Sequence, residues 1–441
     1  MSKFLRLIAW GLFLLPCSNI ICANDSTNRR LLSIDEVFNL AEQNNSSLQS
    51  SKIAAEIAEA AISIAKANRL PDVSASLSFS YLGDGYLTDR DFSNGKNIDM
   101  PHFGNNFAFK ASQAVYTGGA LTAQIKLSEL GHKMSGQEVL ATRNNVRFII
   151  AGYYLQLAML ENQLSVYNAN IALTENVISQ MQARKNEGVV LKNDITRYEL
   201  QLESQKLQRT RIIDNKKIIN HRLVSALGLP NETIIEPDST IFTQMPETLS
   251  EADWQNFATS NSPVLNMSRL NIDIKRTEER LAKSERLPKV ALFAENHFDG
   301  PITIEVPTLN NNFNYWYVGV NLSYNISSLF KSNKKVKQSA ISTRKAKEDF
   351  SNTQEQVENN IQASYTNFLT SFTDLNTQQK SVELANQNYN VVSNRYNNGL
   401  ALVTDLTDAA AMKLQSEIAL VNSRINVIYN YFNLKFTSGK L

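Results

Sequence analysis

The stretch RLPDVSASLSFSY occupies residues 69–81, and a second stretch at residues 286–298 opens with the related pattern RLPKV. In the first stretch an apolar residue stands at every second position, with a serine between each neighbouring pair: Val73, Ala75, Leu77, Phe79 and Tyr81. A period of two predicts a β-strand with one apolar and one polar face. Each copy follows a run with helical spacing, and proline disfavours helix at the residue before it. The pattern RLPxV therefore predicts, twice, a passage from helix to strand.

The N-terminus has the features of a secretory signal. Lys3 and Arg6 precede the apolar run 7–15, and the small residue Ala23 precedes the expected cleavage point. We expect residues 1–23 to be a signal peptide cleaved near Ala23. Its removal takes away two basic and no acidic residues, which reduces the 44 Lys and Arg to the number of Asp and Glu, 42. The mature chain is then neutral, and its basic residues are interspersed with acids, so we expect no nucleic-acid partner.

The cysteine content excludes several kinds of site. Cys17 and Cys22 both lie within the predicted signal peptide, so the exported chain has no thiol for a disulfide or a metal. The alternative is a lipid anchor on one of these cysteines. Pro16 and Ile21 stand where a lipidation signal has Gly, Ala or Ser, so we expect no lipidation.

The sequence contains an internal duplication. Beyond the repeated RLPxV, the stretch RKNEGVVLKNDIT at 184–196 matches RYNNGLALVTDLT at 395–407. Such long, ordered self-similarity indicates two structural repeats. We place them at residues 24–230 and 231–441, each with the order helix, strand, strand, long helix, helix.

Each half has the same predicted elements. The first contains strands 72–82 and 105–117 and a long helix 118–185, and the second contains strands 289–298 and 313–325 and a long helix 328–395. In both long helices apolar residues recur in a heptad rhythm, which predicts coiled-coil packing. A helix over 118–185 would span ~100 Å. Shorter helices laid end to end would match it in length, and these are 47–69 with 193–228 in the first half and 263–286 with 405–437 in the second.

The predicted strands have the length that crosses a bilayer when tilted. Four strands cannot close into a barrel, and open sheet edges are not tolerated in lipid, so oligomerisation must supply the rest. Three copies would give twelve strands. The serine face would then line water, and the apolar face would contact lipid. The lipid-facing residues we select are Val73, Leu77, Phe79, Trp316 and Val320. The alternative is a soluble sheet with one face buried on a core.

Over nearly all of its mature length the chain resembles the TolC-like outer membrane efflux protein family. The resemblance is carried by the duplicated helix–LP–strand unit, the strand–loop–strand pairs and the turns NEGVVLKNDIT and NNGLALVTDLTDA. It implies a mainly α fold with a small membrane β-barrel: a homotrimer whose twelve-stranded β-barrel in the outer membrane continues as a twelve-rod α-helical barrel across the periplasm. It also implies a channel-tunnel for efflux or type I secretion, with no catalytic chemistry and no cofactor. Its partners would be a periplasmic adaptor and an inner-membrane pump of the RND, ABC or MFS type.

The resemblance assigns roles to the two glycine turns. They would form the tip that docks the adaptor, through Gly188, Val189, Leu191, Gly399, Leu400 and Leu402. Next to this tip would lie the periplasmic gate, built from Asp194, Tyr396, Asp405 and Asp408. Asp194 is also placed to pair with Arg197, three positions on along the same helix face. The sequence departs from the family at Ala401, which occupies the position where the family has an arginine. This difference puts the strength of the closed gate in doubt.

Other chemistry finds little support in the sequence. The four histidines His102, His132, His221 and His297 are scattered without metal-ligand spacing. There is no Walker A pattern and no G-x-S-x-G motif. Two alternatives remain: a periplasmic coiled-coil adaptor, which would carry one helical hairpin between β-domains, and a secreted enzyme with a helical accessory region.

Overall fold

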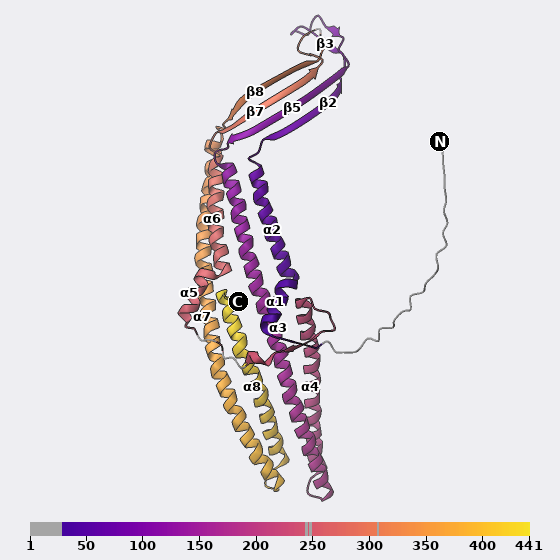
Figure 1. The fold of residues 1–441 in the computed structure, drawn as a ribbon, viewed down its shortest axis with the longest axis vertical. Coiled ribbons are helices and arrows are strands. Elements are labelled where there is room, and N and C mark those ends of the chain that lie inside the picture. Colours follow the sequence, from indigo (N-terminus) through magenta and orange to yellow (C-terminus); the bar gives the residue numbers. More distant parts are fainter. Residues whose placement is uncertain (1–28, 243–245, 247–248, 307) are drawn as a thin grey trace, which may run out of the picture.

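The computed structural model describes residues 29–242, 246, 249–306 and 308–441, so the predicted signal peptide and both cysteines lie outside the described residues. The molecule is elongated, with a sheet at one end and long helices extending from it (Figure 1). Among the described residues, no helix combines the length and apolar character needed to span a membrane.

Four strands form one antiparallel sheet in the order β2–β5–β7–β8. They are β2 (Asp72–Tyr81), β5 (Phe103–Tyr116), β7 (Lys289–Gly300) and β8 (Phe313–Ser323). All four predicted strands are present, with ends that differ slightly from the prediction. β7 continues past 298 because Gly300 still pairs with Asn105, and β8 stops before 325 because Ser323 is paired with Lys289, the first residue of β7.

Each RLPxV segment joins a helix to a strand, as predicted. Pro71 lies between α2 (Ser46–Ala67) and β2, and Pro288 lies between α6 (Pro263–Ser284) and β7. The same tight turn closes both helices. Leu70 N donates to Ala67 O at 2.8 Å, and Leu287 N donates to Ser284 O at 3.1 Å.

Two long helices are the largest elements of the structure. They are α3 (Ala120–Asn186, 67 residues) and α7 (Ser328–Asn397, 70 residues), each ~100 Å long. α3 begins at Ala120 rather than 118 because Gly118 and Gly119 have φ of 66° and 86°, outside the helical region. Shorter helices pack along them in succession: α2 and α4 (Lys192–Leu227) on α3, and α6 and α8 (Val403–Ser438) on α7 (Figure 1).

The predicted heptad positions supply the helix cores. Buried members of the pattern include Ile150, Leu157, Leu160, Ile171, Ile178 and Met181 of α3 and Ile361, Phe368, Leu375, Tyr389 and Tyr396 of α7. Two small members, Ser364 and Ser371, are buried as well. Where Thr174 interrupts the apolar series, its hydroxyl donates to Gln205 Oε1 of α4 at 3.1 Å. A buried polar pair of this kind fixes the register of two helices.

A mixed layer around the middle of the helices was not predicted. It contains β1 (Arg29–Leu32), α1 (Ile34–Asn44), β6 (Ile234–Pro237), a 3-10 turn (Ser239–Phe242) and α5 (Glu251–Asn261). β1 pairs in parallel with β6. Because β6 follows the predicted boundary at 230/231, the two proposed repeats share this small sheet.

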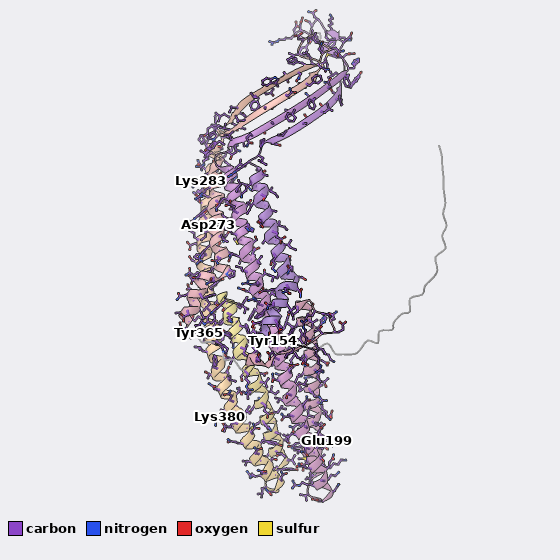
Figure 2. The ribbon with its side chains drawn as sticks, viewed as in Figure 1. Tyr154, Glu199, Asp273, Lys283, Tyr365 and Lys380 are labelled. Carbon is purple, nitrogen blue, oxygen red and sulfur yellow. The ribbon has the colours of Figure 1, made fainter. Side chains whose placement is uncertain are left out.

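Tyr154 of α3 fastens this layer to the long helix (Figure 2). Its side chain is fully buried, and its hydroxyl donates to Leu32 O and accepts from Asp238 N, both at 2.8 Å. Burial raises the pKa of Tyr154 to about 12. The phenol therefore joins the last residue of β1 to the residue that follows β6.

A second small sheet lies beyond the far end of the four strands. It is the hairpin of β3 (Gly85–Leu87) and β4 (Lys96–Ile98), within a segment that sequence analysis left unassigned (Figure 1). The main β2–β5 ladder reaches toward it, since Leu82 N donates to His102 O at 3.0 Å.

Candidate functional site

The sheet has one apolar and one polar face, and the strand register keeps like residues together. Leu77 is opposite Phe107, Phe107 is opposite Phe298, and Leu292 is opposite Val320. Residues directly opposite one another project to the same side of a sheet. The large apolar residues on the apolar face are Val73, Leu77, Phe79, Phe107, Phe109, Leu292, Phe298, Trp316, Val318, Val320 and Leu322, and this face also carries Asn105, Gln113, Asn296 and Asn314. The polar face carries Ser74, Ser76, Ser78, Ser80, Asn106, Lys110, Glu295, His297, Asp299, Tyr315, Tyr317 and Asn321, together with Ala108, Phe293 and Phe313.

The five residues predicted to contact lipid all belong to this apolar face. They are highly exposed in the single chain, from 55% for Val73 to 72% for Trp316. Exposed apolar surface of this extent marks a surface that contacts lipid or another protein. β2 and β8, which carry these residues, are the two edge strands of the sheet.

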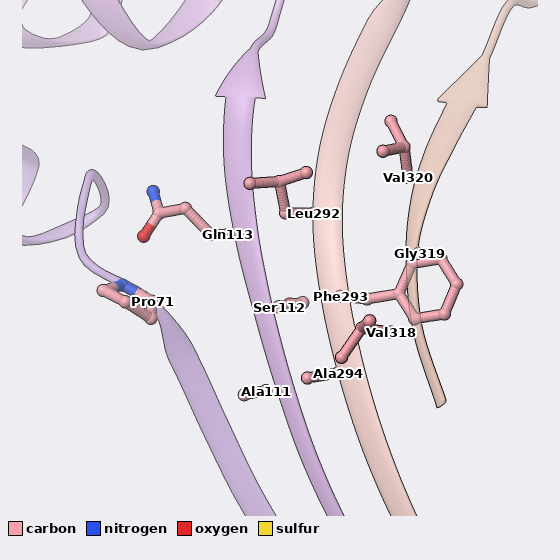
Figure 3. Close-up of a pocket in the computed structure, with 10 residues that line it drawn as sticks. All are labelled: Pro71, Ala111, Ser112, Gln113, Leu292, Phe293, Ala294, Val318, Gly319 and Val320. Carbon is pink, nitrogen blue, oxygen red and sulfur yellow. The ribbon is translucent and has the colours of Figure 1, made fainter. Parts of the chain in front are cut away.

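A hollow of about 620 Å³ lies on the apolar face near the start of β2 (Figure 3). Register places six of its ten lining residues on that face, and these are Ala111, Gln113, Leu292, Ala294, Val318 and Val320. Pro71, Ser112, Phe293 and Gly319 also line it. The hollow forms where small alanines lie between larger aliphatic residues. It is part of the apolar face.

At the opposite end of the molecule, two glycine turns close the helical hairpins α3–α4 and α7–α8 (Figure 1). Gly188 and Gly399 have φ of 79° and 73°, a left-handed conformation that favours glycine. Each turn caps the preceding helix. Val189 N donates to Arg184 O at 3.1 Å, and Leu400 N donates to Arg395 O at 2.8 Å.

The residues after each glycine present apolar side chains to solvent. Val189 is 63% exposed and Leu191 72%, and the equivalent Leu400 and Leu402 have values of 68% and 69%. All six residues predicted for the docking tip therefore lie at this end, as two matching turns. Val190 of the first turn and Val403, which follows Leu402, are buried in one shared core. The exposed residues therefore project from a packed base.

The three acids predicted to form the gate differ in their local contacts. Asp405, in the first turn of α8, accepts a hydrogen bond from Leu402 N at 3.1 Å and so caps that helix. Asp408 is exposed. Asp194, in the first turn of α4, is half-buried, and none of the ion pairs between described residues joins it to Arg197. The predicted Asp194–Arg197 pair is therefore absent from this structure.

Tyr396 lies at the contact between the two hairpins. Burial raises the pKa of its phenol above the usual range, with Arg184 opposing the rise and the Asp194 carboxylate adding to it. Its hydroxyl is buried, and among the described residues it has no hydrogen-bond partner. The structure thus brings Tyr396 and Asp194, two of the predicted gate residues, near one another without a hydrogen bond between them.

Arg184 connects the two hairpins, a role that sequence analysis did not assign. Its guanidinium carbon lies 5.4 Å from the centre of the Tyr396 ring, and its Nη2 donates to Asn397 O at 3.3 Å. The equivalent Arg395 instead binds within its own turn, to Leu400 O at 3.3 Å. The sequence did single out this arginine, because it opens the R-x-x-x-G pattern found at both turns, but the pattern alone did not indicate a function for it.

The ionisable residues of the described chain do not gather into a metal site. Within them, no group of three or more His, Cys, Asp or Glu side chains could hold a metal ion. The histidines lie apart, on the sheet (His297), on the loop before β5 (His102) and on helices α3 and α4 (His132 and His221). The candidate functional surfaces are the two-faced sheet at one end and the paired turns at the other.

Sequence comparison connects the chain with known transport proteins. The model of the family described as outer membrane efflux protein matches residues 37–229 and 254–440. Outer membrane protein TolC of Escherichia coli (strain K12) is 22% identical over 426 residues, covering 92% of this chain and 82% of that protein.

Solved structures share the fold at low sequence identity. The outer membrane protein VceC of Vibrio cholerae superposes with a TM-score of 0.77 and 16% identity, covering 92% of this chain and 96% of that one. The Campylobacter jejuni CmeC outer membrane channel superposes with a TM-score of 0.75 and 17% identity, covering 92% of this chain and 85% of that one. The helices and the four-stranded sheet are thus arranged as in these proteins.

Proposed function

The chain belongs to the outer membrane efflux protein family, and on that premise we propose that three copies assemble into a continuous conduit from the periplasm to the exterior. As a member of this family it is an outer membrane efflux channel and not an enzyme. Export would follow cleavage of residues 1–23 near Ala23, without lipidation.

The two-faced sheet with free edges carries the proposal. β2 and β8 each have one neighbour in the described sheet, and an unpaired edge is not tolerated in lipid. Pairing β8 of one copy with β2 of the next continues the antiparallel order. Three copies then close twelve strands, with the apolar face toward lipid and the polar face around water.

The helices supply further surface for assembly. α2 has exposed isoleucines on its outer side, with exposed fractions of 54% for Ile53 and 67% for both Ile57 and Ile64. Spacings of four and seven residues put them on one stripe of the helix. We assign this stripe to contact with the neighbouring copy, so that four rods from each chain make a twelve-rod helical barrel.

The paired turns are the proposed docking and gating end. Exposed Val189, Leu191, Leu400 and Leu402 offer apolar anchors to a periplasmic adaptor. The adaptor would connect the channel to an inner-membrane pump of the RND, ABC or MFS type, for efflux or type I secretion. Energy would come from that pump.

The acidic side chains near this end are the proposed gate. Asp405 and Asp408 of three chains would place six carboxylates around one axis, which favours cations in a constriction. Asp194 and Tyr396 would complete the gate. Arg184 joins the two tips in this chain, where Ala401 offers no long side chain.

Fractionation of cells tests the proposal. We expect the protein in the outer membrane fraction, as a trimer on unheated detergent gels that dissociates on heating. A monomer recovered from the soluble periplasmic fraction would contradict it and favour a periplasmic protein.

A further inference from the structure

The polar face of β7 and β8 has an unusual composition at the end far from the helices. Three ionisable residues of β7 pair in register with three aromatic residues of β8. We call this cluster the aromatic–acidic ladder, and its members are Glu295, His297, Asp299, Phe313, Tyr315 and Tyr317. The pairs are Glu295 with Tyr317, His297 with Tyr315, and Asp299 with Phe313.

The rings of the ladder form a nearly parallel stack. The His297 and Tyr315 rings are 5.2 Å apart with an interplanar angle of 9°. Phe313 and Tyr315 are 5.2 Å apart at 23°, and Tyr315 and Tyr317 are 6.3 Å apart at 12°. The rings remain open to solvent, with exposed fractions of 36% for Tyr315, 41% for Tyr317 and 54% for Phe313.

Hydrogen bonds hold these rings in place. The Tyr317 hydroxyl donates to Glu295 Oε2 at 2.9 Å, and the Tyr315 hydroxyl donates to Asp299 Oδ2 at 3.2 Å. His297 Nε2 lies 2.9 Å from the same Glu295 oxygen. A surface fixed in this way loses little side-chain freedom when a ligand binds.

The ladder has an excess of negative charge. Its two carboxylates face one lysine, Lys110 of β5, whose Nζ is 3.5 Å from Glu295 Oε2. Asp299 receives a hydrogen bond from the neutral Asn106. Glu295, Asp299 and Lys110 together carry a formal charge of −1 in each chain, and an enclosed site of one sign concentrates ions of the other.

We propose that the ladder is a transit site for planar aromatic cations near the outer mouth of the pore. The inference rests on the proposed function, which makes the polar face the wall of that pore. Flat rings attract both the apolar body and the charge of such a ligand, and the carboxylates attract its charge. Cross-strand stability alone explains the pairing of these residues, but it does not explain why their rings lie exposed on the face that β2 lines with serines.

Fluorescence titration of the purified full-length trimer tests the proposal. The trimer is placed in nanodiscs of phosphatidylcholine, which carry no net charge, and empty nanodiscs give the background. The probe is N-methylacridinium, a permanent planar cation, and anthracene-9-carboxylate is an anion of similar shape. We expect saturable binding of the cation and at least tenfold weaker binding of the anion.

Variants separate the ladder from the rest of the sheet. Tyr315→Leu combined with Tyr317→Leu should weaken cation binding by roughly tenfold, and Glu295→Gln should weaken it as well. Lys110→Gln should strengthen it, because it removes the neighbouring positive charge, and a gain of affinity cannot come from misfolding. Trp316→Leu, between the two tyrosines but on the apolar face, is the matched control and should leave the affinity unchanged.

Two results overturn the inference. A trimer that binds both probes equally has no such site. The same conclusion follows if the tyrosine variant and Lys110→Gln both bind the cation with the affinity of the unmodified chain. The trimer mass is measured on the same sample, so this failure is distinct from failure of the proposed assembly. A sample that is monomeric overturns both.

Discussion

An arginine at Leu77 should disrupt assembly, whereas an arginine at the adjacent Ser76 should not. Leu77 is five residues after Asp72, where β2 begins, which is about 17 Å along the strand at ~3.4 Å per residue. With a tilt of about 40° this becomes a depth of ~13 Å, near the middle of an apolar band ~25 Å tall. A charge there costs ~2–4 kcal/mol per chain. Three symmetric copies raise the cost to ~6–12 kcal/mol per trimer.

Ser76 provides a matched control on the same strand. It projects to the polar face, opposite Ala108, so its arginine would reach water in the proposed lumen. The assay is the amount of heat-dissociable trimer in the outer membrane at equal expression. Leu77→Arg should lose most of it, and Ser76→Arg should retain it. If both variants assemble equally well, or both fail equally, the assignment of the two faces is wrong.

Three further predictions concern the tip, the gate and the middle layer. Leu191→Asp with Leu402→Asp should abolish efflux in cells while trimers still form, because both side chains are exposed; loss of the trimer would instead indicate a role in folding. In planar bilayers, Asp405→Asn combined with Asp408→Asn should abolish two properties of the channel, its preference for cations and its block by a trivalent cation. Persistence of both properties would exclude the carboxylate ring. Tyr154→Phe removes two hydrogen bonds to the backbone and leaves only the direct bond from Asp238 N to Leu32 O at 3.2 Å, so it should lower the free energy of unfolding by ~1–3 kcal/mol in urea titration. Since burial raises the pKa of Tyr154 to about 12, the folded state favours the neutral phenol. Its contribution should be complete below pH ~10 and lost as the pH rises toward 12, whereas a Tyr154→Phe difference that does not change over this range would contradict the assignment.

The strands and long helices were predictable because their signals are local and repeated. Alternation around Leu77 and heptads around Leu157 each specify one buried or exposed face, and Pro71 and Pro288 mark the turns between them. The register of the sheet then follows, since a slip by one residue would exchange the apolar and polar faces.

The middle layer was missed because its strands are short and depend on distant partners. β1 and β6 have four residues each and pair across about half of the sequence. The two helices of this layer, α1 and α5, did carry a sequence signal, because each begins with a capping box. The boxes are formed by Ser33 with Glu36 and by Ser250 with Asp253. Searching for this spacing would have found both helix starts.

The tip shows what a pattern of spacings leaves undetermined. The sequence placed Asp194 and Arg197 on one helix face, but proximity along a helix does not oblige two exposed side chains to pair. It also identified Arg184 only as part of a repeated pattern. Its contact with Tyr396 depends on how the two hairpins pack, and that packing is a tertiary property.

Electron microscopy of single particles extracted from the outer membrane tests the central claim most directly. The account predicts a threefold-symmetric tube, with a closed strand barrel at one end and helices ~100 Å long leading from it around a continuous axial cavity. Particles containing one chain, or an assembly in which β2 and β8 remain unpaired and no axial cavity passes through the strands, would contradict it.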